Sequence, residues 1–180
     1  MAEIDIFASL LFEEAKRFYE LSLLHDTEDG KVAYLHAALS IGVSSLEAHI
    51  NAIAEELLLR KNLSILDHSI LMEADFALRN GEYVITNGLK IYRTLERYEF
   101  IYNRFGRVKL NKTLAWWSKL KNALEARNNL IHPKDELNIT QGIVESALDG
   151  ILSALDSIYF SLYKKKFPAA RRKLHSKMVF

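Results

Sequence analysis

Residues 144–162, VESALDGILSALDSIYFSL, carry the clearest structural signal in the chain. Large apolar residues return there every three or four positions, a spacing that places side chains on one face of an α-helix. A helix with one apolar face buries it against other elements, most simply against other helices. The stretch therefore predicts a long helix in a helical domain, with these residues on its buried face: Val144, Leu148, Ile151, Leu155, Ile158 and Leu162.

The same spacing recurs upstream and predicts further helices at about residues 4–24, 31–60, 65–78, 91–105 and 113–131. Ser64 and Asp67 form a capping-box pattern at the start of the third of these segments. Gly106 is a typical C-terminal cap for the fourth. Residues 82–86 lie between two Asn-Gly pairs and could form a small hairpin, but we interpret them as a loop. We therefore predict an all-α fold, an antiparallel bundle of four to five core helices plus one short extra helix.

Composition limits the protein class. The chain has 180 residues, of which 49% are apolar, so one domain with a sizeable core is expected. It has no cysteine, which excludes disulfides, thiolate zinc sites and a thiol nucleophile. Acidic residues near the N-terminus are unlike a signal peptide, and no apolar run approaches the ~18 residues of a membrane span. These features predict a soluble, cytoplasmic protein that makes no contact with a membrane.

The net charge of +1 conceals an asymmetry. Asp156 is the last acidic residue, and residues 157–180 carry seven basic ones, so the rest of the chain has a charge of −6. We therefore divide the chain into a helical bundle at 4–163 and a basic C-terminal tail at 164–180. The tail could bind RNA through its positive charge, or it could simply be a solvated terminus. The RNA-binding candidates are Lys164, Lys165, Lys166, Arg171, Arg172 and Lys173.

Aromatic and basic residues alternate in the segment 91–107, a combination that can bind RNA by stacking and charge. Tyr98, Tyr102 and Phe105 nevertheless fall on the apolar stripe. Core packing is therefore our interpretation of the aromatic residues, and the arginines of the segment, including Arg97, are expected to cover the outer face of the helix.

Arg127 interrupts the apolar face of the helix predicted at 113–131. At about 100° per residue, Arg127 lands between the directions of Leu120 and Trp116, within an arc that also holds Leu130 and Ile131. A guanidinium on such a face must be paired, reach solvent or meet a second subunit. One interpretation is a purely structural pair with a carboxylate such as Glu47 on the second helix.

Asn128 and His132 lie four residues apart, one turn above one another on an edge of the same arc. Pro133 disfavours helical geometry at His132, so the helix should end there. Histidine is the usual proton shuttle near neutral pH, and the planar fork of arginine suits a phosphate. Arg127, Asn128 and His132 are therefore chemically suited to act on a phosphodiester. The alternative is a helix end at which His132 is merely a capping residue.

The stretch Arg127-Asn128-Asn129-Leu130-Ile131-His132 resembles the signature of HEPN domains: arginine, a polar residue, three variable positions and histidine. Its place at the end of a late helix, with one long helix following, also resembles that family. Glu47 is similar to an acidic position that some members keep on the second helix. The resemblance covers about residues 4–163 and implies a HEPN-like helical bundle.

The resemblance implies a metal-independent endoribonuclease acting as a homodimer, with one composite cleft holding both arginines and both histidines. His132 would act as acid and base, Arg127 would bind the scissile phosphate, and Asn128 would orient the histidine or the phosphate. Such enzymes serve as toxins, defence proteins or stress effectors, so a neutralising antitoxin or regulatory protein is a further expected partner. Two alternatives stay open: a non-catalytic module binding protein, nucleotide or RNA, and a purely structural dimerisation domain.

No cofactor or metal is expected. The histidines show no metal-ligand spacing, and the sequence contains no His-Glu-x-x-His motif. Glycines occur as turn signals rather than in a phosphate-binding loop. The chemistry of the candidate site therefore depends on side chains alone.

Overall fold

The computed structural model of the chain describes residues 3–134 and 138–180. These residues form six α-helices, one two-stranded sheet and a short 3-10 helix, so the chain is mostly helical as predicted. The elements follow in this order: α1 (Glu3–Leu24), α2 (Glu28–Leu58), α3 (Ile65–Met72), β1 (Ala74–Arg79), β2 (Glu82–Leu89), α4 (Thr94–Phe105), α5 (Ala115–Ile131), α6 (Gln141–Tyr163) and the 3-10 helix η1 (Pro168–Arg172).

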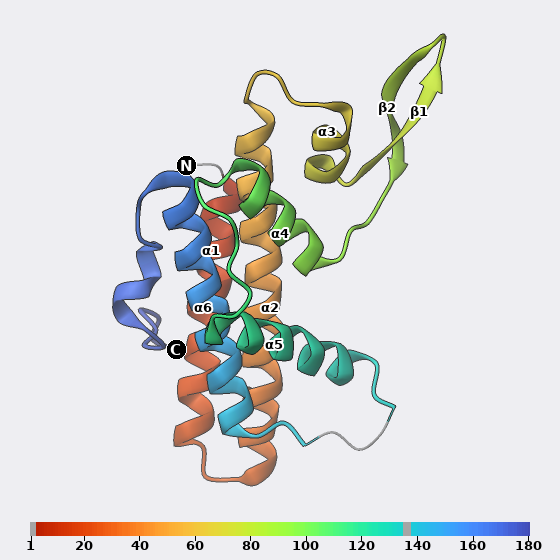
Figure 1. Cartoon of the computed structure of the whole chain (residues 1–180). Helices are drawn as coiled ribbons and strands as arrows, with labels where there is room; N and C mark the ends of the chain where they lie inside the picture. Colours follow the sequence, from red (N-terminus) through yellow and green to blue (C-terminus); the bar gives the residue numbers. More distant parts are fainter. Residues whose placement is uncertain (1–2, 135–137) are drawn as a thin grey trace.

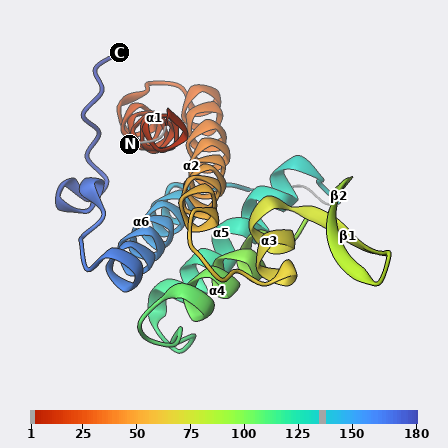
Figure 2. The same ribbon diagram turned by 90° about the horizontal axis from the view of Figure 1, so that it is seen from above.

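The core lies between the three longest helices, α1, α2 and α6, which run side by side (Figure 1). All six residues predicted on the apolar face of α6 are buried, which confirms the 3.6-residue periodicity read from the sequence. Viewed from above, α4 and α5 lie against α2 and α6 on the side away from α1 (Figure 2). The approach of α5 to α6 is close, because a Cβ added at Gly150 would sit 2.9 Å from the backbone nitrogen of Leu120.

Helix ends follow local capping chemistry. The capping box of Ser64 and Asp67 is present at the start of α3, and Gly106 caps α4, both as predicted. Helix α2 begins at Glu28 rather than near residue 31, because the side chain of Thr27 accepts a hydrogen bond from the backbone N–H of Gly30. Asx and hydroxyl caps of this kind satisfy the amides that a helix leaves free at its start.

The segment 74–89 contradicts the prediction of a purely helical fold. It is an antiparallel hairpin in which Arg79 faces Glu82 across a two-residue turn. Asn80 and Gly81 both have positive φ, 53° and 84°, which is the geometry that closes such a turn. The helix predicted to reach residue 78 ends at Met72, and the loop predicted at 82–86 is part of β2. The hairpin projects away from the helices (Figure 1).

Beyond α6, the C-terminal segment 164–180 turns back over the helices. Lys164 has a φ of 57° and ends α6, after which the chain passes along α1 (Figure 2). Phe167 of this segment is buried in the core. Within the described ranges, no helix is long and apolar enough to cross a membrane.

Candidate functional site

Helix α5 leaves the core before it ends. Its buried residues, which include Trp117 and Leu124, lie in its first three turns, and every residue of the helix after Leu124 is at least partly exposed. Ile131, predicted on the apolar arc, is 51% exposed. The last turns of α5 project beyond α6 in Figure 1. The candidate site therefore lies on a projecting helix end and not in a closed cavity.

Arg127 contacts Glu47 on α2. The distance from Arg127 Nη2 to Glu47 Oε1 is 2.6 Å, and the Thr94 hydroxyl at the start of α4 donates to the same oxygen at 3.0 Å. The side chains of Arg127 and Glu47 are 21% and 39% exposed, so water still reaches the pair. Arg127 Nε is buried and has no hydrogen-bond partner within the described part of the chain. The structure thus brings together two residues that lie 80 positions apart.

Asn128 and His132 lie on the outer side of the same helix end. The backbone N–H of His132 donates to the Asn128 carbonyl at 2.9 Å, and His132 is the C-terminal cap of α5. The helix ends where the sequence predicted, at the residue before Pro133. Both side chains are exposed. Asn128 and His132 can therefore be reached by a polyanion or a second protein chain.

A polar cavity of about 240 Å³ adjoins the Arg127–Glu47 pair. Glu47, Asn51, Thr94 and Arg97 contribute to its wall, together with residues at the base of the hairpin. The cavity thus joins the candidate site to the polar packing between α2, α3 and α4. Sequence analysis did not identify it, because its lining residues come from segments far apart in the chain.

Arg97 is buried in this region, which corrects the expectation that it covers the outer face of its helix. Its guanidinium donates to the carbonyls of Ile70 and Leu71, at 3.2 and 2.6 Å, and to Glu73 Oε2 at 2.9 Å. It also donates to the side-chain oxygen of Asn51. Burial lowers the pKa of Arg97, and the Glu73 carboxylate opposes that shift. Arg97 donates to carbonyls that the C-terminal end of α3 leaves without an intrahelical partner, and so has a structural role in fixing the base of the hairpin.

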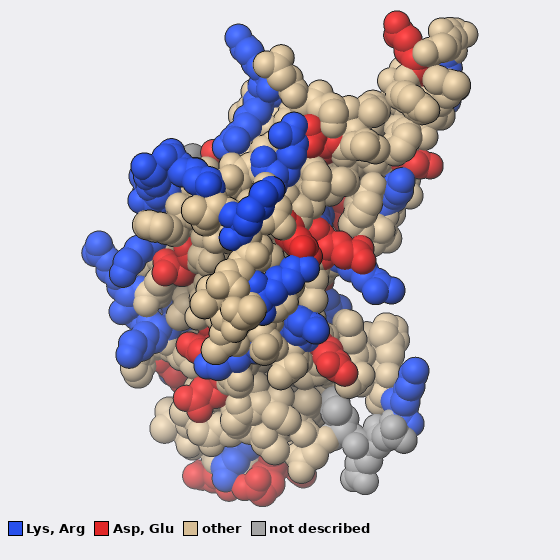
Figure 3. All heavy atoms as spheres, in the orientation of Figure 1, with Lys and Arg blue, Asp and Glu red and all other residues tan. Residues whose placement is uncertain are grey.

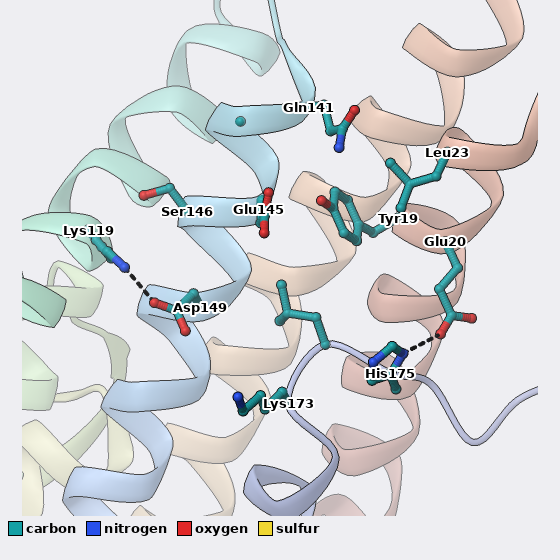
Figure 4. A pocket seen from close by; sticks show the side chains of 12 residues that line it. Tyr19, Glu20, Leu23, Lys119, Gln141, Glu145, Ser146, Asp149, Lys173 and His175 are labelled. Carbon is teal, nitrogen blue, oxygen red and sulfur yellow. Dashed lines mark hydrogen bonds and ion pairs between the residues drawn. The ribbon is translucent and has the colours of Figure 1, made fainter.

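A larger groove, of about 730 Å³, lies between α1, α6 and the C-terminal segment (Figure 4). Lys119 and Asp149 form an ion pair of 2.6 Å along one wall. Tyr19 lies on the opposite wall, and burial raises the pKa of its hydroxyl. Lys173 is the one member of the predicted RNA-binding set that lines this groove, and Arg127, Asn128 and His132 are not among its lining residues.

The other predicted RNA-binding residues also lie far from the end of α5. Lys164, Lys165, Lys166 and Arg171 are exposed on the C-terminal segment. Arg172 instead forms an ion pair of 2.6 Å with Glu13 of α1. The C-terminal segment and the end of α5 occupy opposite sides of the molecule in both ribbon views (Figures 1 and 2).

The described residues contain no group of three potential metal ligands of the His, Cys, Asp or Glu type. In the comparisons with known proteins, no family model, no curated protein and no solved structure matches this chain.

Proposed function

We propose that this chain is a metal-independent endoribonuclease that acts as a homodimer, as its resemblance to HEPN domains implies. The observation that carries the proposal is the exposed end of α5. There Asn128 and His132 are accessible one turn apart, and Arg127 lies beside them with a partly exposed guanidinium. Histidine can transfer the protons of an attack by a hydroxyl on a neighbouring phosphodiester, and arginine and asparagine can hold the phosphate.

In the proposed reaction, His132 accepts the proton of the ribose 2′-hydroxyl, whose oxygen attacks the neighbouring phosphorus. The bond between phosphorus and the 5′-oxygen breaks, and a protonated His132 supplies the proton to that oxygen. The products are a 2′,3′-cyclic phosphate and a 5′-hydroxyl, and no oxidant, metal or water is consumed. Arg127 stabilises the charge that develops on the phosphoryl oxygens, and Asn128 orients the phosphate or the imidazole.

A second copy of the chain would complete the site. The same turn of α5 carries Ile131, which is exposed, and Leu130, which is half-buried. Apolar residues beside functional polar groups are typical of a surface that another chain covers. Two such surfaces facing each other across a two-fold axis would place two sets of Arg127 and His132 around one cleft.

One observation favours the alternative of a non-catalytic helical module that binds protein, nucleotide or RNA. Arg127 already has a carboxylate partner in its own chain, Glu47, at 2.6 Å. A phosphate must compete with that carboxylate, or bind the remaining donors of the guanidinium. A purely structural role for Arg127 makes the same pair permanent, so only measurements on variants separate these functions.

The test is cleavage of mixed RNA in EDTA by the purified wild type and by His132→Ala and Arg127→Ala. General acid–base catalysis contributes about 10²–10⁴-fold to rate, so His132→Ala should reduce cleavage by at least about 100-fold. Arg127→Ala should reduce it to a similar degree, since an electrostatic donor contributes about 10²–10³-fold. The cyclic phosphate is identified on the 3′ end of the product by mass spectrometry.

Matched controls come from the same helix. Lys121 is an exposed residue of α5 outside the motif, and Asn129 is exposed at one of its variable positions, so Lys121→Ala and Asn129→Ala should cleave like the wild type. Circular dichroism checks that each variant retains its helical content. Cleavage that survives in His132→Ala would contradict the proposed site, and the absence of cleavage by all proteins would favour the binding module.

A further inference from the structure

The C-terminal segment is attached to the helices by a buried aromatic anchor. Phe167 is 1% exposed, and its ring packs edge-on against Phe12 of α1, His49 of α2 and Tyr159 of α6, with centroids 5.1 to 6.1 Å apart. Its backbone N–H donates to Asp156 Oδ1 at 2.8 Å. The segment is thereby held at the point where it leaves α6.

A second attachment is built around Glu13 of α1. The buried carboxylate accepts from Lys16 at 2.7 Å, from Arg172 at 2.6 Å and from the backbone N–H of Lys177 at 2.7 Å. The hydroxyl of Ser176 donates to the Glu13 carbonyl at 2.7 Å. Lys16 also donates to the carbonyl of His175 at 3.0 Å. The segment is thus fixed at both ends of its basic stretch.

These attachments direct most of the cations outward. The anchoring residues point into the helices, and the cations between them and beside them are exposed. None of these cations forms an ion pair with any residue that the structure describes. We call the following set the basic face: Lys164, Lys165, Lys166, Arg171, Lys173 and Lys177. Figure 3 shows blue side chains gathered along the edge of the molecule where Figure 1 draws this segment.

The carboxylates near the basic face differ in whether cations neutralise them. Glu13 is neutralised by Lys16 and Arg172, so the buried junction adds no negative potential. Lys165 and Lys166 share a groove with Asp5, Glu55 and Glu56, and Lys173 shares another with Glu20, Glu145 and Asp149. Arg171 lines neither of these grooves, so the face is tested at Arg171 together with Lys173.

We propose that the basic face is a second RNA-binding surface, which holds the phosphate backbone without reading its sequence. The inference rests on the proposed function in taking RNA as the substrate. Fixed cations attract a phosphate array and release its counterions. Among these cations Phe167 and Ala169 are buried, and the exposed large apolar residues of the segment, Val179 and Phe180, lie beyond Lys177, so the cationic stretch itself lacks the outward apolar surface with which a helix lies on a membrane.

The position of the basic face gives it a specific consequence. It lies on the opposite side of the helices from the end of α5 (Figures 1 and 2). A short RNA bound at His132 cannot also reach the basic face of the same chain, whereas a long RNA can pass from one to the other. The basic face should therefore favour long substrates and leave the reaction step unchanged.

The test compares two double variants with the same change in net charge. One is Arg171→Glu with Lys173→Glu on the basic face. The control is Lys61→Glu with Arg79→Glu, two exposed cations in the loop after α2 and at the hairpin tip. Binding of an RNA of about 40 nucleotides is measured by fluorescence anisotropy at about 50 and 200 mM salt, in a His132→Ala background that prevents cleavage.

We expect the basic-face variant to bind the long RNA at least about 10-fold more weakly at low salt, with a shallower dependence on salt because fewer counterions are released. The control variant should bind like the parent protein. In the background with His132 intact, the basic-face variant should raise KM for the long RNA and leave kcat unchanged. Its cleavage of an RNA of about six nucleotides should not change.

Equal losses in the two double variants, or no loss in either, would overturn the proposal. Loss of binding to anionic vesicles without loss of RNA binding would overturn it too, in favour of a membrane surface. If the wild type cleaves RNA but the basic-face variant binds and cleaves long RNA like the wild type, the ribonuclease proposal stands and the proposal of a second RNA-binding surface is wrong. If the basic-face variant alone loses RNA binding and no protein cleaves RNA, the RNA-binding surface is supported and the ribonuclease proposal is contradicted.

Discussion

Two arginine–glutamate pairs in this chain have the same length and different surroundings. Arg127 and Glu47, between α5 and α2, are 2.6 Å apart, and so are Arg172 and Glu13, between the C-terminal segment and α1. The Glu13 side chain is 2% exposed, whereas that of Glu47 is 39% exposed. Distance alone therefore does not distinguish a pair that holds the fold from a pair that can open.

The difference lies in the other hydrogen bonds at each carboxylate. Glu13 is closed off from water by Lys16, by the backbone N–H of Lys177 and by Arg172. Among the described residues, Glu47 accepts from Arg127 and Thr94, both on a single oxygen. A buried, fully bonded carboxylate leaves several charged or polar groups unsatisfied when it is removed, whereas water replaces a partly exposed one.

The largest expected effect is that of Glu13→Ala, because it leaves Lys16 buried without its partner. We expect the free energy of unfolding to fall by about 3–5 kcal/mol, measured by urea denaturation. Glu47→Ala is the matched change in the exposed pair, and it should cost about 1 kcal/mol or less. Equal losses of unfolding free energy in Glu13→Ala and Glu47→Ala would contradict the distinction between the two ion pairs.

A smaller loss of unfolding free energy is expected when the pH is lowered. Burial acts to raise the pKa of Glu13, but hydrogen bonds from Lys16, from the Lys177 backbone and from Arg172 outweigh it and hold the pKa below the ordinary value of 4.5. The folded carboxylate thus binds its proton more weakly than the unfolded one. It contributes stability that is fully present above about pH 4.5 and is lost as pH falls through the folded pKa.

Glu13→Gln removes this titration. The wild type should therefore be more stable than Glu13→Gln at pH 7, and the difference should shrink as pH falls below about 4.5 and Glu13 takes up its proton. Urea unfolding at a series of pH values measures the difference. A difference that stays constant over this range would show that the Glu13 carboxylate does not carry the acid sensitivity.

The site around the Arg127–Glu47 pair could be partly predicted from the sequence, because its sequence signals are local. The spacing of Arg127, Asn128 and His132 along one helix, and the end of that helix before Pro133, follow from residues within two turns of each other. The pairing of Arg127 with Glu47 is one of three interpretations of a guanidinium on an apolar face. What spacing could not give was the departure of α5 from the core after Leu124.

The Arg172–Glu13 pair could not be predicted from the sequence, because its two residues are far apart in the chain. Arg172 and Glu13 are separated by 159 positions, and a run of cations gives no indication of which member turns inward. Arg97 was misplaced for the same reason, since its acceptors come from α2 and from the end of α3. The hairpin was missed although Asn80-Gly81 is a turn signal, because residues 74–78 had been assigned to the preceding helix.

The smallest expected effect is that of Glu47→Gln. The amide oxygen can still accept hydrogen bonds from Arg127 and Thr94, and solvent screens the lost charge, so the free energy of unfolding should change by less than about 1 kcal/mol. Glu55→Gln, an exposed position on the same helix, gives the baseline for a charge change that breaks no ion pair among the described residues. Urea denaturation of both variants measures the difference.

The outcome bears directly on Arg127. A loss near the Glu55→Gln baseline would mean that the bond to Glu47 adds little to the fold, so Arg127 can exchange this carboxylate for a phosphate. A loss as large as that of Glu13→Gln would make the Arg127–Glu47 pair a structural junction like that of Arg172. In that case the guanidinium would not be available to an RNA phosphate, and the binding or structural interpretation of the α5 end would replace the catalytic one.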